Sequence, residues 1–122
     1  MNKIGIINFP SSNTKNLISV LKRNSCNPKL ISNKKELNLI DKLILPGVGS
    51  AKVALEFLNQ KNMKNELKYF IKNQTPVMGI CLGMQILFEH SDEFNIPCVG
   101  IYDGRVKKLN DKFTKVPNIG WH

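Results

Sequence analysis

The sequence predicts an α/β fold in which a mostly parallel sheet carries helices on both faces. Short apolar, β-branched runs alternate four times with amphipathic segments of helical period before residue 90. Strands that are covered on both faces form continuous apolar runs of this kind. The 122 residues suffice for one domain at most, and the hydrophobic content of 42% is enough for a core.

Each element follows from its local pattern. Strands are expected where apolar residues run together before turn residues, at 3–8, 28–32, 42–45 and 76–80, the last being the most buried. Helices are expected where apolar residues recur every three or four positions, at 14–24, 51–59, 63–73 and 83–90, with a short piece at 37–40. Later apolar runs predict strands at 98–101, 105–109 and 116–119. Because sites of parallel sheets lie beyond the carboxyl ends of the strands, the loops 9–13, 46–50 and 81–83 should meet.

Composition excludes several classes of protein. No apolar run approaches the ~18 residues of a membrane span, and the first residues do not resemble a signal peptide, so a cytoplasmic location is expected. The three cysteines, Cys26, Cys81 and Cys98, form neither a disulfide framework nor a Cys-x-x-Cys pair. We therefore expect free thiols, no metal site and no cofactor.

The charge is strongly basic but does not predict nucleic-acid binding. The net charge is +9, yet all but two of the basic residues are lysines, and they are dispersed. Base readout and bidentate phosphate contacts favour arginine. Residues 1–75 hold 13 basic and 4 acidic residues, which accounts for the whole excess. They form either a solvated surface or a basic face toward an acidic partner or a phosphorylated substrate.

The segment Gly79-Ile80-Cys81-Leu82-Gly83 is a Gly-x-Cys-x-Gly pattern between a predicted strand and a predicted helix. It matches a nucleophile elbow with cysteine in place of serine. A tight strand-to-helix turn needs glycines where side chains would collide, and the helix N-terminus favours the thiolate. A small buried cysteine before a helix explains Cys81 equally well, but it would not need glycine on both sides.

A second glycine-rich segment, Pro46-Gly47-Val48-Gly49-Ser50, follows the third predicted strand. Its glycines let the backbone approach a ligand, and successive N–H groups can bind an anion. An ordinary turn and a dinucleotide loop are the alternatives. The dinucleotide pattern is incomplete because Lys52 stands where its third glycine belongs.

These segments resemble the class I (triad-type) glutamine amidotransferases. The resemblance rests on LPGVG from Leu45, GICLGMQILFE from Gly79, Gly104-Arg105-Val106, and VPxxGW, which ends at Trp121. Taken together, they are most similar to the glutaminase subunits of imidazole glycerol phosphate synthases, which serve histidine biosynthesis. The resemblance covers nearly the whole chain.

The resemblance implies a mechanism and a set of site residues. Cys81 would attack the side-chain amide of glutamine and form a thioester, and the released ammonia would pass to a partner synthase, here the cyclase. Backbone N–H groups of Leu82, Val48 and Gly49 would hold the oxyanion. Matching positions suggest that Gly47, Gly49, Gln85 and Glu93 bind glutamine, and that Asn13 and Trp121 contact the partner. The alternative is that Gln85 and Glu93 are solvated residues at helix ends with no role in binding glutamine.

Two segments depart from the family's usual pattern. The loop Asn8–Asn13 keeps only the last residue of Asp-Tyr-Gly-x-Gly-Asn, and residues 117–122 end in His122 where the family usually has Asn. Related amidotransferases that act in surface-sugar amidation share the main motifs and are the alternative. Contacts with nucleic acid or membrane are not expected.

The resemblance also implies a His-x-Glu pair near the C-terminus of full-length members, which run to roughly 200 residues. This chain contains only His90, expected at a helix end, and His122. We therefore expect residues 1–122 to be the N-terminal part of a single amidotransferase domain that lacks turnover by itself. A non-catalytic binding module and a cysteine hydrolase unrelated to glutamine are the other readings.

Overall fold

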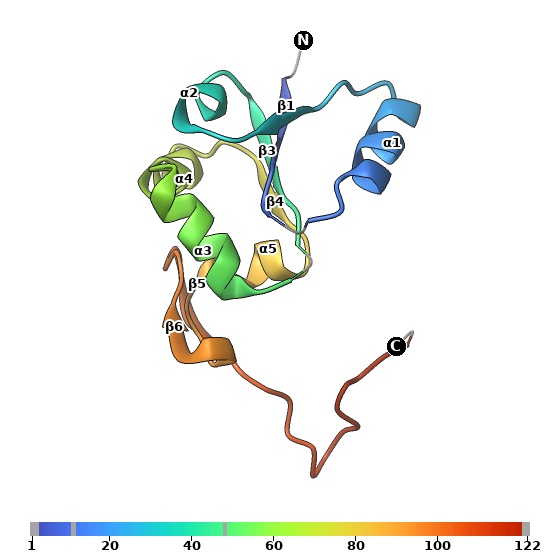
Figure 1. Ribbon diagram of the computed structural model, residues 1–122, viewed down its shortest axis with the longest axis vertical. Coiled ribbons are helices and arrows are strands. Elements are labelled where there is room, and N and C mark those ends of the chain that lie inside the picture. The colour runs from blue at the N-terminus through green and yellow to red at the C-terminus, as the bar shows by residue number, and fades with distance from the viewer. Residues whose placement is uncertain (1–2, 11, 48, 121–122) are drawn as a thin grey trace.

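The computed structural model describes residues 3–10, 12–47 and 49–120, and its main feature is a four-stranded parallel sheet (Figure 1). The strands are β1 (Ile4–Ile7), β2 (Lys29–Ile31), β3 (Lys42–Leu45) and β4 (Val77–Gly79). Their order is β2-β1-β3-β4, and every neighbouring pair is parallel. The predicted α/β class with a mostly parallel sheet is confirmed, and the four strands lie within the predicted ranges.

Helices flank this sheet on both sides. Figure 1 shows α1 (Lys15–Arg23) on one side, and α2 (Lys34–Leu37), α3 (Ala51–Gln60) and α4 (Lys64–Lys72) on the other. Local capping helps to place them. The side chain of Asn33 accepts a hydrogen bond from the Glu36 N–H, and that of Ser50 accepts one from the Lys52 N–H.

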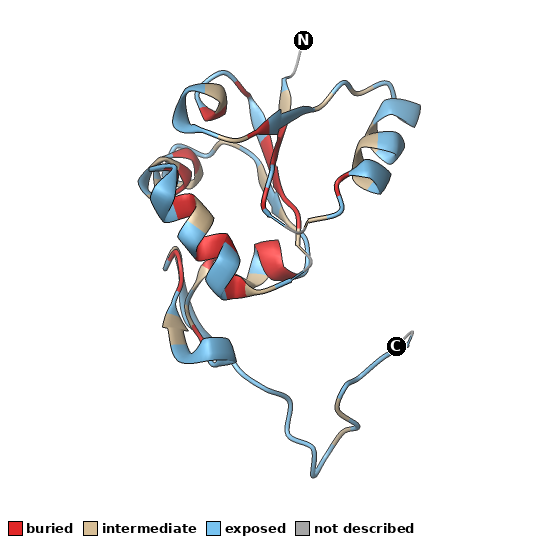
Figure 2. Ribbon diagram, viewed as in Figure 1, coloured by how far each residue is buried: buried red, intermediate tan, exposed pale blue. Residues whose placement is uncertain are grey.

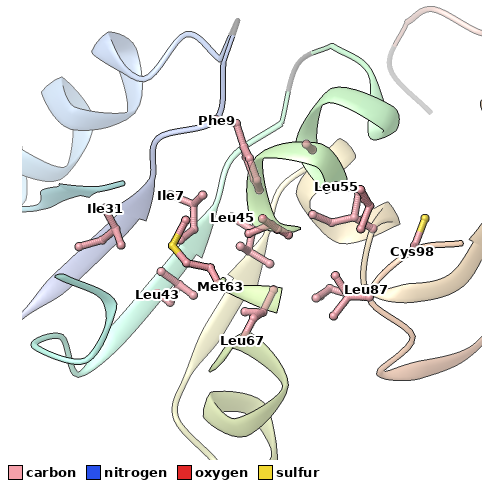
Figure 3. Packing of buried hydrophobic residues seen from close by; sticks show 14 of the residues in the cluster. Ile7, Phe9, Ile31, Leu43, Leu45, Leu55, Met63, Leu67, Leu87 and Cys98 are labelled. Atoms are coloured by element: carbon pink, nitrogen blue, oxygen red, sulfur yellow. The ribbon is translucent and has the colours of Figure 1, made fainter. Parts of the chain in front are cut away.

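The hydrophobic core lies between the sheet and the α3–α4 side. Ile7, Leu43 and Leu45 point from the strands toward the two helices, as Figure 3 shows. Leu58 and Met63 are fully buried there. Figure 2 shows red, buried positions on α3, while α1 has no buried residue and covers its face of the sheet more loosely.

A second, smaller sheet follows the helix α5 (Leu82–Gln85). Its strands are β5 (Phe88–Ser91), β6 (Ile96–Pro97) and β7 (Tyr102–Val106), in the order β6-β5-β7. β5 pairs antiparallel with β6 and parallel with β7, and the short 3-10 helix η1 (Glu93–Asn95) joins β5 to β6. Hydrogen bonds from Val99 N–H to Ile86 O and from Ile101 N–H to Leu87 O attach this sheet to α5.

The predicted helix 83–90 is wrong in length, because α5 ends at Gln85 and His90 lies on β5. The periodic residues Met84, Leu87 and Phe88 fitted a helix. In the structure, however, the carbonyl groups of Ile86 and Leu87 accept hydrogen bonds from the 99–102 segment instead of from the next helical turn. A non-local pairing therefore overrides the local period.

Four strand predictions also need correction. The segments 98–101 and 116–119 are not strands, and β7 begins at Tyr102 and ends at Val106, whereas 105–109 was predicted. β4 is not the most buried strand, because it lies at the edge of the sheet and Met78 is 60% exposed. An apolar run indicates that a strand can be buried. Whether the strand is buried depends on its position in the sheet.

Within the described ranges, no helix is long and apolar enough to cross a membrane.

Candidate active site

Cys81 occupies the turn between β4 and α5 with a strained backbone. Its φ is 52° and its ψ is −111°, a left-handed conformation that L-residues other than glycine rarely adopt. The turn is held on both sides, because the Ile80 N–H donates to Leu45 O at 2.9 Å and the Gln85 N–H donates to Cys81 O at 3.1 Å. The thiol-bearing residue is exposed. This is the geometry of a nucleophile elbow.

Glycine is required on either side of Cys81 because neighbouring backbone leaves no room for a side chain. A Cβ at Gly79 would lie 2.7 Å from the backbone of Met84. A Cβ at Gly83 would overlap the carbonyl oxygen of Leu45 on β3. Real Cβ atoms do not approach backbone atoms so closely, so both positions exclude every side chain. The predicted reason for glycine on both sides of Cys81 agrees with this packing.

The loop after β3 lies against the elbow. A Cβ at Gly47 would be 2.5 Å from the carbonyl oxygen of Ile80 and 2.6 Å from the Gly83 nitrogen. Gly49 has a φ of 113°, and Val48 lies outside the described residues. The loops 46–50 and 81–83 are therefore brought together, as the sequence predicts. The oxyanion role of Val48, Gly49 and Leu82 remains a prediction.

Gln85 and Glu93 line the same hollow, of about 400 Å³. Gln85 is the last residue of α5, one turn after Cys81, and Glu93 opens η1. The other lining residues are Ser91, Asp92, Val106, Lys107 and Lys108. Charged groups of both signs thus line this space, whose lining includes Gln85 but not Cys81.

The sequence does not single out Asp92, Lys107 and Lys108, which line the hollow in the structure. They join the hollow because β7 pairs with β5, which brings the end of β7 beside η1. The Asp92 N–H donates to Val106 O at 2.9 Å and fixes this arrangement. The only signal in the sequence was the adjacent pair of lysines after Val106.

His90 takes part in a polar cluster on the small sheet. Its Nδ1 lies 3.2 Å from an Arg105 guanidinium nitrogen, and the same nitrogen donates to Asp92 Oδ1 at 2.9 Å. His90 and Arg105 face each other across the β5–β7 pairing. The cluster ties the two strands together beside the hollow.

Of the predicted partner residues, Asn13 is exposed in the loop before α1. In that loop Phe9 turns inward and packs edge-on against Phe57, with ring centroids 5.8 Å apart. Trp121 and His122 lie outside the described residues. The structure therefore describes one of the two proposed interface residues.

Neither of the other cysteines lies at the elbow. Cys98 is buried between α3 and the small sheet, and burial raises the pKa of its thiol, an effect partly offset by the charge of Lys64. Cys26 is half-buried at the amino end of the large sheet. Among the described residues, no group of three or more His, Cys, Asp or Glu side chains could hold a metal ion.

The turn geometry at Cys81 agrees with the comparisons to known proteins. The family model for glutamine amidotransferase class-I matches residues 5–117. The chain belongs to this family. The predicted family resemblance is confirmed over nearly the full length of the chain.

Two curated relatives show which members of the class-I family the chain is similar to. The chain is 37% identical over 123 residues to imidazole glycerol phosphate synthase subunit HisH of Xylella fastidiosa, and it covers 60% of that protein. It is 40% identical to the subunit of the same name in Prochlorococcus marinus, of which it covers 56%. Our chain thus spans about three-fifths of the length of these relatives.

Solved structures show the same fold. A crystal structure of a glutamine amidotransferase matches 84% of the chain with a TM-score of 0.71 at 18% identity, and the match covers 54% of that protein. The structure of PurLQS from Thermotoga maritima matches 71% of the chain with a TM-score of 0.57 at 23% identity, over 43% of the solved chain. The α/β arrangement is therefore that of this class of amidotransferases.

Proposed function

We propose that this class-I amidotransferase chain is the glutamine-hydrolysing part of an imidazole glycerol phosphate synthase. The observation that carries the proposal is the strained elbow at Cys81, with Gly79 and Gly83 packed against backbone on either side. The named relatives supply the biosynthetic context.

The proposed reaction begins at the Cys81 sulfur. The thiolate attacks the carbon of the glutamine side-chain amide, and the C=O electrons move to oxygen to give a tetrahedral oxyanion. Backbone N–H groups of Leu82 and of the 47–49 loop are the donors for that oxyanion. Collapse expels the nitrogen, which takes up a proton and leaves as ammonia. Water then hydrolyses the thioester, releasing glutamate and the thiol.

The hollow beside α5 is the proposed binding site for the amino-acid end of glutamine. Free glutamine carries a carboxylate and an ammonium group on its α-carbon. Lys107 and Lys108 offer positive charge to the carboxylate, while Asp92 and Glu93 offer negative charge to the ammonium. Gln85 lines this hollow at the end of α5, the helix that follows Cys81, and its amide can both donate and accept hydrogen bonds to the substrate.

The ammonia acceptor in this proposal is a cyclase subunit, with which the chain forms a heterodimer in the cytoplasm. Asn13 and Trp121 are the residues proposed to contact it. The support is the naming of the curated relatives as synthase subunits.

Affinity labelling tests the proposal. A diazoketone analogue of glutamine should alkylate Cys81, and the peptide carrying the adduct is identified by mass spectrometry. Substitution C81A should abolish the adduct, whereas the matched control C26A should label at the rate of the unaltered chain. Labelling of C81A at an unchanged rate would refute the elbow assignment. Glutamate release at a normal rate by the 122-residue chain alone would refute the expected dependence on a His-x-Glu pair.

A further inference from the structure

The amino ends of the large sheet carry a second hollow, far from the elbow in the fold. This hollow measures about 460 Å³ and is lined by Lys3, Ile4, Ser25, Cys26, Asn27, Lys29 and Lys42. Cys81 lies at the carboxyl ends of the same strands, where β4 runs into α5. The second hollow therefore lies at the opposite end of the large sheet from the elbow, and the function proposed above does not use it.

Three lysines are placed at this hollow by the strand register. Lys29 and Lys42 are the first residues of β2 and β3, and Lys3 directly precedes β1. Because β1 lies between β2 and β3, these three strand starts are neighbours. The register pairs Gly5 with Lys29 and Ile4 with Lys42, so the lysines are nearly level with one another.

Lys3, Lys29 and Lys42 form no side-chain ion pair within the described part of the chain, although Glu36 lines an adjoining hollow together with Lys3 and Lys29. Asp41 is adjacent to Lys42, but its Oδ2 accepts a hydrogen bond from the backbone N–H of Lys3 at 2.8 Å, and it does not line the hollow. No acidic side chain lines the space.

The surrounding turn adds polar groups and further charge. Ser25 and Asn27 contribute hydrogen-bonding side chains to the lining. Lys22 and Arg23 occupy the last turn of α1, directly before this turn. The excess of basic residues in the first part of the sequence is thus gathered in part at one edge.

We propose that this hollow binds a small phosphorylated anion, such as a phosphate monoester or a diphosphate group. Lysine ammonium groups act as point charges toward phosphate oxygens, and three lysine residues line this concave space. The volume falls within the range of small-molecule sites, roughly 300–1,000 Å³. No aromatic side chain lines it, so it offers no platform for stacking the bases of a nucleic acid.

Calorimetric titration with inorganic pyrophosphate at constant ionic strength tests the site. The unaltered chain should bind one equivalent. The combined variant K3Q/K29Q/K42Q should bind at least about tenfold more weakly, because it loses three charge-assisted contacts. The matched control K52Q/K61Q/K112Q removes the same charge from exposed lysines outside the hollow and should bind within about twofold of the unaltered chain. The variant K3R/K29R/K42R keeps the charge and should keep binding.

Cysteine protection supplies a second readout that does not depend on the lysine variants. Pyrophosphate should slow alkylation of Cys26, which lines the hollow, and leave alkylation of Cys81 unchanged. Absence of saturable binding, equal weakening in the control variant, or equal protection of both cysteines would overturn the proposal. Tighter binding of a single-stranded oligonucleotide than of pyrophosphate would overturn the assignment to a small anion. A failure of glutamine-analogue labelling at Cys81 would leave this result unaffected.

Discussion

The two sheets of the molecule are held together in different ways. The large sheet is built from apolar strands whose inner residues, such as Leu43 and Leu45, are almost completely buried. The small sheet has an exposed strand, β7, and is joined by polar contacts of Glu89, Asp92 and Arg105. The large sheet positions Cys81, the proposed nucleophile, through packing, and the small sheet positions the charged lining of the neighbouring hollow through side-chain hydrogen bonds. Changes in the first should affect folding, and changes in the second should affect substrate binding.

The largest expected effect is at the junction of the large sheet and the elbow. Substitution G83A places a methyl group on the carbonyl of Leu45 and should cost at least about 3 kcal/mol of unfolding free energy, measured by urea denaturation. G100A is the matched control in the connection between β6 and β7 of the small sheet. Gly100 has open space around its Cβ position but a φ of 73°, so it should cost only about 1 kcal/mol. Similar losses of unfolding free energy in G83A and G100A would refute the proposed difference between the two positions.

In the small sheet we expect a smaller loss of unfolding free energy but a clear loss of binding of the glutamine analogue. Arg105 is half-exposed, so R105A should lower the unfolding free energy by less than about 1 kcal/mol. It releases Asp92 and His90 beside the hollow, and the rate of labelling by the glutamine analogue at low concentration should fall several-fold. R23A, at the end of α1, removes the same charge and should label normally. Normal labelling of R105A would show that the cluster does not organise the hollow.

The smallest effect concerns Cys98, which directly follows β6 of the small sheet. Burial raises the pKa of this thiol, with the charge of Lys64 opposing the shift, so the folded chain keeps the thiol neutral at a pH where the unfolded chain ionises it. Its contribution is fully present below the ordinary thiol pKa of about 8.5 and is lost as pH rises through the folded value. The difference in unfolding free energy between the unaltered chain and C98A should therefore shrink above about pH 9. A pH-independent difference would contradict this reasoning.

The large sheet could be predicted from the sequence because its information is local. Ile4–Ile7 and Lys42–Leu45 are short apolar runs bounded by turn residues, and their neighbours show helical periods. Cys81 could be predicted for a related reason, since the glycines at 79 and 83 are required by contacts a few residues away and by β3 directly beside them.

The small sheet could not be predicted because its information is non-local. The segment Phe88–Ser91 has no strand-like alternation and continues the helical period of Met84 and Leu87. Its conformation depends on hydrogen bonds from residues 98–102, which no local pattern reveals. The lining residues Lys107 and Lys108 depend on the same pairing, so their place at the hollow is also a consequence of tertiary structure.

The contact of Gly47 with the elbow has a consequence for anyone who redesigns this scaffold. Position 47 contacts Ile80 and Gly83, and position 83 contacts Leu45, so the end of β3 and the start of α5 pack closely, largely through backbone atoms. Loop 46–50 therefore cannot be replaced independently of residues 80–83 in order to alter specificity. A transplanted loop will fit only if it brings glycine at its second position, and variation at the two loops must be selected in pairs.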